Sequence, residues 1–253
     1  MSIPRHWILL VLAITQMATT LWPTLTGIGE LVQVRSDTYP TPVVPIGWTF
    51  AIWGVIYLGT SAFAIWQFLA ANRNSALVNR VAPAIAWMFL VNTVWQVWVS
   101  IVGFGWIDFL MLASEAAAGT WVLIQLTRQS ERLRLQEVLF LAAPIGLLTG
   151  WTTAATFVGS TVSASALELG VWATSASFGY GLLIAAIAVA SLLLLVHRNL
   201  AYAAAGIWAL WGVSANAQVK GLEAIQAVSL QGMGVLAVLC LGVAGWLAFK
   251  RFA

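Results

Sequence analysis

The sequence predicts an all-α fold, a polytopic transmembrane bundle of about eight helices. Of its 253 residues 61% are hydrophobic and only 8% are charged, whereas a soluble domain carries roughly 25% charged residues. The 11 Lys and Arg and 8 Asp and Glu residues cluster between apolar stretches of about 20 residues, the length that crosses a bilayer as a helix. Lipid offers the backbone no hydrogen-bond partner, so such stretches must be helical.

The first apolar stretch, residues 7–26, follows Arg5 and His6 and so resembles a signal peptide. No small-residue cleavage site follows it, and the apolar run continues past Trp22. We therefore interpret it as a retained first helix.

The second span, 47–71, is preceded by the longest connection, an outer loop at 27–46. Its prolines, Pro40, Pro42 and Pro45, make the approach to this helix extended and stiff.

The third, fourth and fifth spans are predicted at 82–103, 107–127 and 137–159. Gly103 marks the short connection after the third span, and a basic run that begins at Arg128 separates the fourth from the fifth.

The last three spans are predicted at 171–196, 200–218 and 228–249. The middle one is short and contains Asn216 and Gln218, so its apolar pattern is the weakest of the eight.

Lys and Arg in the loops predict the orientation of the bundle. With the N-terminus inside, the inner segments hold Arg5, Arg73, Arg80, Arg128, Arg132, Arg134, Arg198, Lys250 and Arg251. The outer segments hold only Arg35 and Lys220. We expect both termini to be cytoplasmic and the protein to be integral to a bacterial inner (plasma) membrane. The basic clusters are thus topology signals, and no nucleic-acid partner is expected.

The chain has fifteen tryptophans, nine of which fall near the predicted membrane boundaries, where Trp is commonly found. The other six lie roughly 7–15 Å below the outer end of their helices at 1.5 Å rise per residue. They are Trp53, Trp95, Trp98, Trp151, Trp208 and Trp211. An indole N–H at that depth requires an acceptor, so these side chains should face protein or water.

Polar residues fall at similar depth. Asn92 and Gln96 are four residues apart on the third span, and Tyr57 lies on the second. On the fourth span Asp108 lies near the outer boundary, and Glu115 is roughly 12 Å in. An ionisable group within a span indicates a functional site, although buried polar residues can also simply join helices. We interpret the whole set as a polar, aromatic cavity open to the outer side.

The stretch Pro45–Trp66, PIGWTFAIWGVIYLGTSAFAIW, resembles the second-helix signature of the TspO/MBR family of tryptophan-rich sensory proteins. The matching residues are Pro45, Trp48, Phe50, Trp53 and Tyr57, with one residue fewer than in the family between Phe50 and Trp53.

Later helices are similar to the same family. Asn92 and Trp95 resemble its third-helix motif, and Asp108 matches an early acid in its fourth helix. Pro144, Trp151 and Ala155 resemble its fifth-helix motif. The first loop has Tyr39 but no Trp, and Gly159 stands where the family often has Asn. We therefore expect a TspO/MBR-like five-helix region at 1–160 and an additional three-helix region at 161–253, in one membrane-embedded unit.

The resemblance implies a binding, sensing or transport protein for tetrapyrroles, sterols or similar flat molecules, with the pocket between helices beneath the first loop. The expected ligand-binding residues are Pro45, Trp48, Phe50, Trp53, Tyr57, Asn92, Trp95, Gln96, Trp98, Asp108, Glu115 and Trp151. The expected partners are membrane lipid and this hydrophobic ligand, with a homodimer left open. No cofactor is predicted, and porphyrin or haem is considered only as a ligand.

Two alternatives stay open. One is a proton-coupled transporter with Asp108 and Glu115 as its relay. The other is a membrane enzyme that degrades porphyrins, with Trp53, Trp95 or Trp151 supplying electrons or protons. Since no nucleophile–base pair, metal cluster or phosphate loop is visible in the sequence, a non-enzymatic role is favoured.

Overall fold

The computed structural model describes residues 4–39, 41–129 and 133–252, and this part of the chain contains helices but no strand. The helices are α1 (Arg5–Thr20), α2 (Trp22–Thr26), α3 (Val32–Asp37), η1 (Gly47–Ala51), α4 (Ile52–Trp66), α5 (Ala70–Arg73), α6 (Ala76–Ile101), α7 (Trp106–Thr127), α8 (Leu135–Glu137), η2 (Val138–Ala142), α9 (Ala143–Ala166), η3 (Val171–Thr174), α10 (Ala176–His197), α11 (Leu200–Val219) and α12 (Glu223–Phe252).

The predicted all-α transmembrane bundle is confirmed. Six helical stretches are long and apolar enough to cross a membrane: Gly47–Trp66, Ala76–Ile101, Trp106–Thr127, Leu135–Ala166, Ala176–His197 and Glu223–Phe249. α1 and α11 lie alongside them in the same bundle, so each of the eight predicted spans corresponds to one long helical stretch.

α11 is not among these six stretches, and half of its residues are buried. Ten of its twenty residues are buried, whereas only 17% of the apolar window of α10 or of α12 is buried. A helix surrounded by other helices contacts little lipid, so it does not require a uniformly apolar surface.

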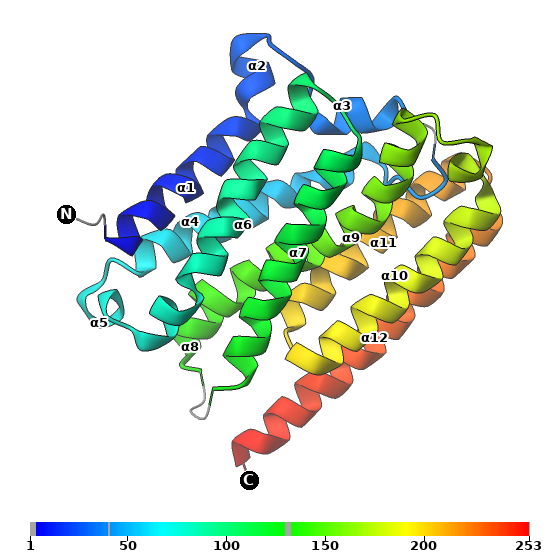
Figure 1. The fold of residues 1–253 in the computed structure, drawn as a ribbon. Helices are drawn as coiled ribbons and strands as arrows, with labels where there is room; N and C mark the ends of the chain where they lie inside the picture. The colour runs from blue at the N-terminus through cyan, green and yellow to red at the C-terminus, as the bar shows by residue number, and fades with distance from the viewer. Residues whose placement is uncertain (1–3, 40, 130–132, 253) are drawn as a thin grey trace.

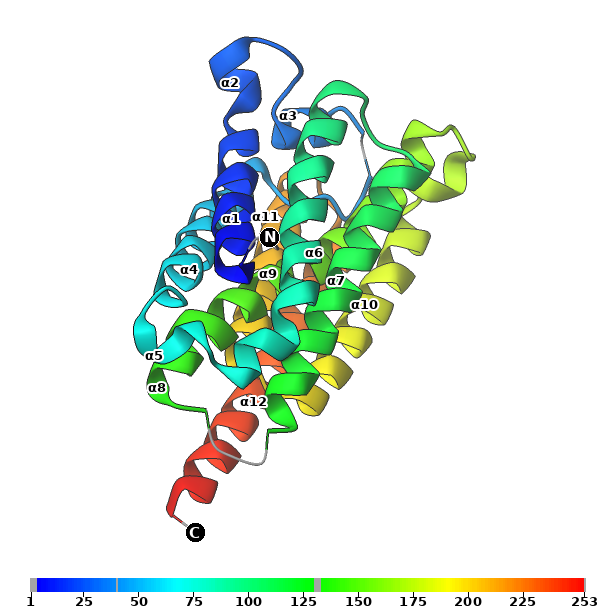
Figure 2. The same cartoon turned by 60° about the vertical axis from the view of Figure 1, so that its left-hand side comes forward.

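The long helices run side by side, with α1, α4 and α6 at one edge of the bundle and α10 and α12 at the other (Figure 1). α9 and α11 connect the two groups, since α9 packs against α7 and α11, and α11 packs against α12. α1 begins and α12 ends at the end of the bundle that holds α5 and α8 (Figure 1), and α2 and α3 lie at the opposite end (Figure 2). Of the predicted additional region, α10 and α11 pack directly on α9, whereas α12 packs on α10 and α11.

Side-chain oxygens cap the N-termini of three of the long helices by accepting hydrogen bonds from backbone N–H groups of the first turn. Ser75 accepts from the backbone N–H of Val78 at the start of α6 (3.3 Å). Ser175 begins α10 in the same way (3.3 Å), and Asn199 accepts from the N–H of Tyr202 to begin α11 (3.0 Å).

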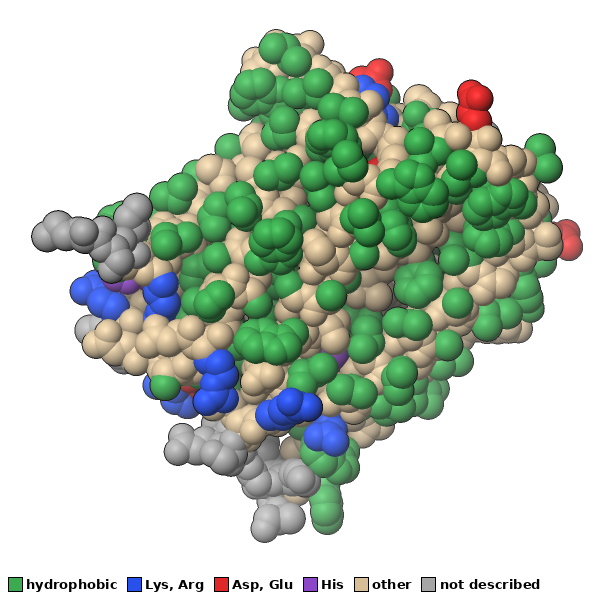
Figure 3. Space-filling model, viewed as in Figure 1, with side chains coloured by type: hydrophobic (Ala, Val, Ile, Leu, Met, Phe, Trp, Pro, Cys, Tyr) green, Lys and Arg blue, Asp and Glu red, His purple; other side chains and the backbone are tan. Residues whose placement is uncertain are grey.

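Basic side chains gather at the end where α1 begins, and hydrophobic side chains cover the surface between the two ends (Figure 3). There Arg5 donates to Gln67 Oε1 (2.9 Å) and to the carbonyl oxygen of Arg73 (2.7 Å), joining α1 to the connection between α4 and α6. Arg132, and the side chains of Lys250 and Arg251, lie outside the described part of the chain. Which end faces the cytoplasm stays a prediction from the charge pattern.

Candidate ligand-binding site

An aromatic cavity lies beneath α3, between α6, α9 and α11. Its free space is about 540 Å³, including the part that is open at its mouth. It is lined by Val32, Ser36, Pro45, Phe50, Trp95, Phe104, Leu112, Trp151, Ala154, Ala155, Val158, Gly159, Val162, Ala209 and Val213. We call it the aromatic cavity because four of these side chains carry aromatic rings.

A second cavity, with a more polar lining, adjoins it on the side of α1. Its free space is about 430 Å³. It is lined by Thr19, Thr20, Pro23, Glu30, Leu31, Val32, Gln33, Phe50, Trp53, Gln96 and Ser100. Val32 and Phe50 line both this polar cavity and the aromatic cavity. The predicted cavity beneath the first loop is therefore present as two compartments on either side of Phe50.

Rings from η1, α4, α6 and α9 meet at this junction. The ring of Trp151 is edge-on to Phe50 (centroids 5.9 Å apart) and to Trp53 (6.1 Å). Trp53 is tilted against Trp95 (6.2 Å) and stacks on Tyr57 (5.3 Å). These are the separations at which aromatic pairs attract one another, so the rings hold each other in fixed orientations.

Two of these rings carry an unused hydrogen-bond donor. Trp53 and Trp95 are 5% and 3% exposed, and the indole Nε1 of each is buried without a hydrogen-bond partner in the described part of the protein. Buried polar groups in native proteins nearly always have a partner. An acceptor on a bound molecule would satisfy these donors.

A chain of hydrogen bonds leads from the polar cavity into the bundle. Gln96, in the lining, donates from Nε2 to the hydroxyl of Tyr57 (2.7 Å), which donates to Asn92 Oδ1 (3.1 Å). Asn92 Nδ2 then donates to Glu115 Oε1 (3.4 Å). Glu115 is fully buried, and its Oε2 has no partner among the described residues. The polar residues predicted at one depth are thus a single connected network.

Asp108 does not belong to this network. Its carboxylate accepts from the backbone N–H of Gly105 and from the Ser163 hydroxyl (3.3 Å), so it caps α7 and ties that helix to α9. Leu112, which is 1% exposed, lies one turn further along α7 towards Glu115, and no hydrogen bond in the described part joins Asp108 to Glu115. Asp108 and Glu115 are therefore two separate polar sites.

Trp48 and Trp98 do not line either compartment. Trp48 is 41% exposed and packs edge-on against Trp208 (5.2 Å) and Trp211 (4.8 Å). Trp98 is partly buried against the main core. Among the predicted residues, the cavity linings contain Pro45, Phe50, Trp53, Trp95, Gln96 and Trp151.

α11 supports the site, a role that its sequence did not predict. It is joined to the proline-rich segment before α4 by hydrogen bonds from Ile46 N to Gly212 O (3.1 Å), from Trp208 Nε1 to Thr49 O (2.8 Å) and from Asn216 Nδ2 to Val44 O (2.7 Å). Ala209 and Val213 of α11 also line the aromatic cavity. Asn216, the polar residue that weakens the apolar pattern of this span, was the sequence signal for this contact.

A family model described as TSPO-like protein matches residues 5–242, which include all or most of every long helix from α1 to α12. Searches of the curated proteins and of the solved structures return no match to this chain. The matched stretch is almost the whole chain, and it includes the second-helix motif at Trp48–Tyr57 and the helices that surround the two cavities. The chain therefore belongs to the family of TSPO-like proteins.

Proposed function

We propose that this membrane protein binds a flat hydrophobic molecule, such as a tetrapyrrole or a sterol, in the aromatic cavity, in order to sense or transport it. The observation that carries the proposal is the pair of buried indole N–H groups without a hydrogen-bond acceptor in the described part of the protein. Trp95 lines the aromatic cavity, and Trp53 lines the adjoining polar cavity. Membership of the TSPO-like family supports a membrane protein of this general kind.

The lining matches a planar ligand with a few polar atoms. Aromatic faces and edges contact flat rings favourably, and ligand pockets are lined mainly by apolar and aromatic side chains with a few polar groups, as this one is. The polar cavity, with Gln33, Gln96 and Ser100, offers hydrogen bonds to a substituent of the ring system. A ligand that passes Phe50 would contact both compartments.

The test is ligand titration of the purified protein in detergent with protoporphyrin, haem and a sterol, followed by tryptophan-fluorescence quenching. Ala155 lines the aromatic cavity, so Ala155→Phe fills it, whereas Ala117→Phe places the same ring on an exposed position of α7. Overpacking of about 1–3 kcal/mol predicts an increase in Kd of roughly fivefold or more for Ala155→Phe.

Unchanged affinity of all three ligands in Ala155→Phe, with Ala117→Phe also unchanged, would refute binding in this cavity. Trp95→Phe keeps the ring but removes the N–H, and it should weaken binding of a ligand with an acceptor by roughly three- to tenfold, the net worth of one hydrogen bond. Equal quenching in Trp53→Phe, Trp95→Phe and the unmodified protein would contradict the role of the two indoles.

A second candidate function is proton-coupled transport. The buried Glu115 with its unpartnered Oε2, joined through Asn92 and Tyr57 to Gln96 at the polar cavity, favours it. Glu115→Gln preserves the shape and the acceptor oxygen. Loss of pH-dependent ligand flux in vesicles, with affinity unchanged, would support transport, whereas unchanged flux would leave Glu115 a structural member of the network.

A further inference from the structure

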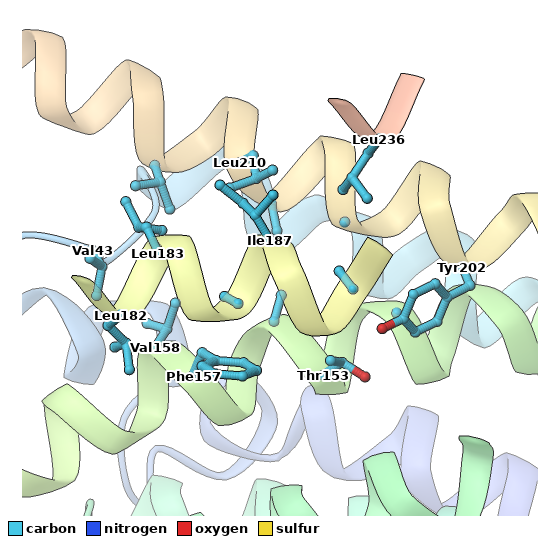
Figure 4. A pocket seen from close by; sticks show the side chains of 17 residues that line it. Val43, Thr153, Phe157, Val158, Leu182, Leu183, Ile187, Tyr202, Leu210 and Leu236 are labelled. Atoms are coloured by element: carbon cyan, nitrogen blue, oxygen red, sulfur yellow. The ribbon is translucent and has the colours of Figure 1, made fainter. Parts of the chain in front are cut away.

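A third cavity lies on the other side of α9, enclosed by α9, α10, α11 and α12 (Figure 4). Its free space is about 560 Å³, including the part that is open at its mouth. We call it the aliphatic cavity, because most of the seventeen residues that line it are Ala, Val, Leu and Ile. Nothing in the proposed function uses it.

The lining of the aliphatic cavity does not fit a flat ring system. Only two of its residues, Phe157 and Tyr202, have aromatic rings, and no residue in the lining is charged. Its hydroxyl groups are those of Thr153 and Tyr202. A ligand that binds here is therefore a hydrocarbon with at most one small polar group.

That polar group has a defined place. Tyr202 is 1% exposed, and its hydroxyl has no hydrogen-bond partner in the described part of the protein. Figure 4 shows this hydroxyl pointing towards Thr153. The Thr153 hydroxyl donates to the carbonyl oxygen of Thr149 (2.7 Å), which leaves its oxygen free to accept. The polar side chains of this lining are therefore one pair of neighbouring hydroxyls, with which the polar end of a bound molecule would exchange hydrogen bonds.

The cavity is elongated along the helices. On α11 its lining extends from Tyr202 to Val213, roughly 16 Å at 1.5 Å rise per residue. On α10 it extends from Leu182 to Ala190, roughly 12 Å. The hydroxyl pair is near one end, and Leu182 and Val43 are at the other (Figure 4). This shape suits an extended chain.

The surrounding bilayer can supply such a chain. Phe157, Leu182 and Ala186 line the cavity and are only partly buried, and neighbouring residues of α10 such as Ile184 are exposed on the apolar surface. A chain that enters from this side would move from lipid into a lining of equal polarity, and it would gain the hydrogen bond to Tyr202.

We propose that the aliphatic cavity is a binding site for a single hydrocarbon chain that ends in a hydroxyl or an ester carbonyl, with that group at Tyr202 and Thr153. Both a free long-chain alcohol and an acyl chain of a membrane lipid carry this chemistry. The site is separate from the aromatic cavity, although Ala154, Val158, Ala209 and Val213 form a shared wall between the two.

The test is photo-crosslinking of the full-length protein in lipid nanodiscs with two probes. One is hexadecanol with a diazirine in its chain, and the other is phosphatidylcholine with a diazirine in one acyl chain. The expected result is labelling of peptides from α9 and α10 that line the cavity, and competition by unlabelled hexadecanol. Labelling by the phospholipid alone, or by hexadecanol alone, identifies the source of the chain.

Three variants make the test specific. Ala186→Trp fills the cavity and should reduce labelling roughly tenfold, whereas Ala185→Trp, its neighbour on the exposed face of α10, should not. Tyr202→Phe removes only the hydroxyl and should weaken hexadecanol competition roughly three- to tenfold, while a diazirine alkane without a polar end is unaffected.

Equal labelling in Ala186→Trp and Ala185→Trp, or labelling confined to residues outside the lining, would overturn the proposal. Equal competition in Tyr202→Phe and the unmodified protein would overturn the role of the hydroxyl. Ala186 does not line the aromatic cavity and Ala155 does not line this one. The proposal can therefore fail while ring binding holds, and the reverse is also distinguishable.

Discussion

Gly212 allows α11 to approach the proline-rich segment before α4. A Cβ atom at this position would overlap Cγ2 of Thr49, and it would lie 3.0 Å from the Cβ atoms of both Thr49 and Pro45. Thr49 is buried and its side chain is branched at Cβ, so it cannot rotate out of the way. Gly212→Ala therefore requires α11 and the segment to move apart.

The magnitude follows from two opposing effects. Overpacking in a close contact destabilises by about 1–3 kcal/mol, whereas Ala in place of Gly within a helix stabilises by about 0.5–1 kcal/mol. The control Gly242→Ala carries only the second effect, because no heavy atom lies within 4 Å of its added Cβ. The difference between the two variants isolates the overpacking, about 2 kcal/mol, or roughly 4–8 °C in Tm for a chain of this size.

The assay is thermal unfolding of both variants in the same detergent, together with ligand titration. Gly212→Ala should melt below Gly242→Ala by this margin, and its ligand affinity should fall because Pro45, Phe50 and Val213 line the aromatic cavity. Equal melting temperatures of the two variants would refute the close packing of α11 on this segment. A lower Tm with unchanged affinity would show that α11 stabilises the fold without shaping the cavity.

Two further changes test the polar groups. Tyr57→Phe leaves Gln96 Nε2 without its acceptor and Asn92 Oδ1 without its donor, so it should lower the unfolding free energy by about 1–3 kcal/mol. Tyr180→Phe, at a ring that is 41% exposed, should change it little, and equal melting of the two would contradict the network. Asp108→Asn retains an acceptor for the Gly105 N–H and should preserve both Tm and ligand affinity, whereas Asp108→Leu should lose about 0.5–2 kcal/mol of stability. Weaker ligand binding by Asp108→Asn at unchanged Tm would show that Asp108 contacts the ligand.

The number and order of the long helices follow from the sequence. Apolar stretches of about 20 residues must form helices in lipid because the backbone has no other partner there. The depth of each residue in the membrane can also be predicted from the sequence, since each residue advances a helix by about 1.5 Å. For this reason Tyr57, Asn92, Gln96 and Glu115, which were predicted at similar depth, are found in one hydrogen-bonded network.

Only the tertiary structure shows which neighbour each side chain faces, because the rotation of a helix about its axis is set by the side chains that pack between neighbouring helices. Trp95 faces a cavity while Trp98, three residues further along the same helix, packs against the core. Asp108 and Glu115 share a helix, yet the first caps its N-terminus and the second accepts from Asn92. Depth alone could not separate these roles.

The sequence by itself thus determined the transmembrane helices, the depth of their polar and aromatic residues and the family resemblance. Only the tertiary structure placed α11 against the segment before α4, divided the predicted cavity at Phe50 and enclosed the aliphatic cavity between α9 and α12. The physical reason is that helix formation in lipid is a local property of the chain. Cavities, in contrast, arise where side chains from several distant helices fail to fill the space between them.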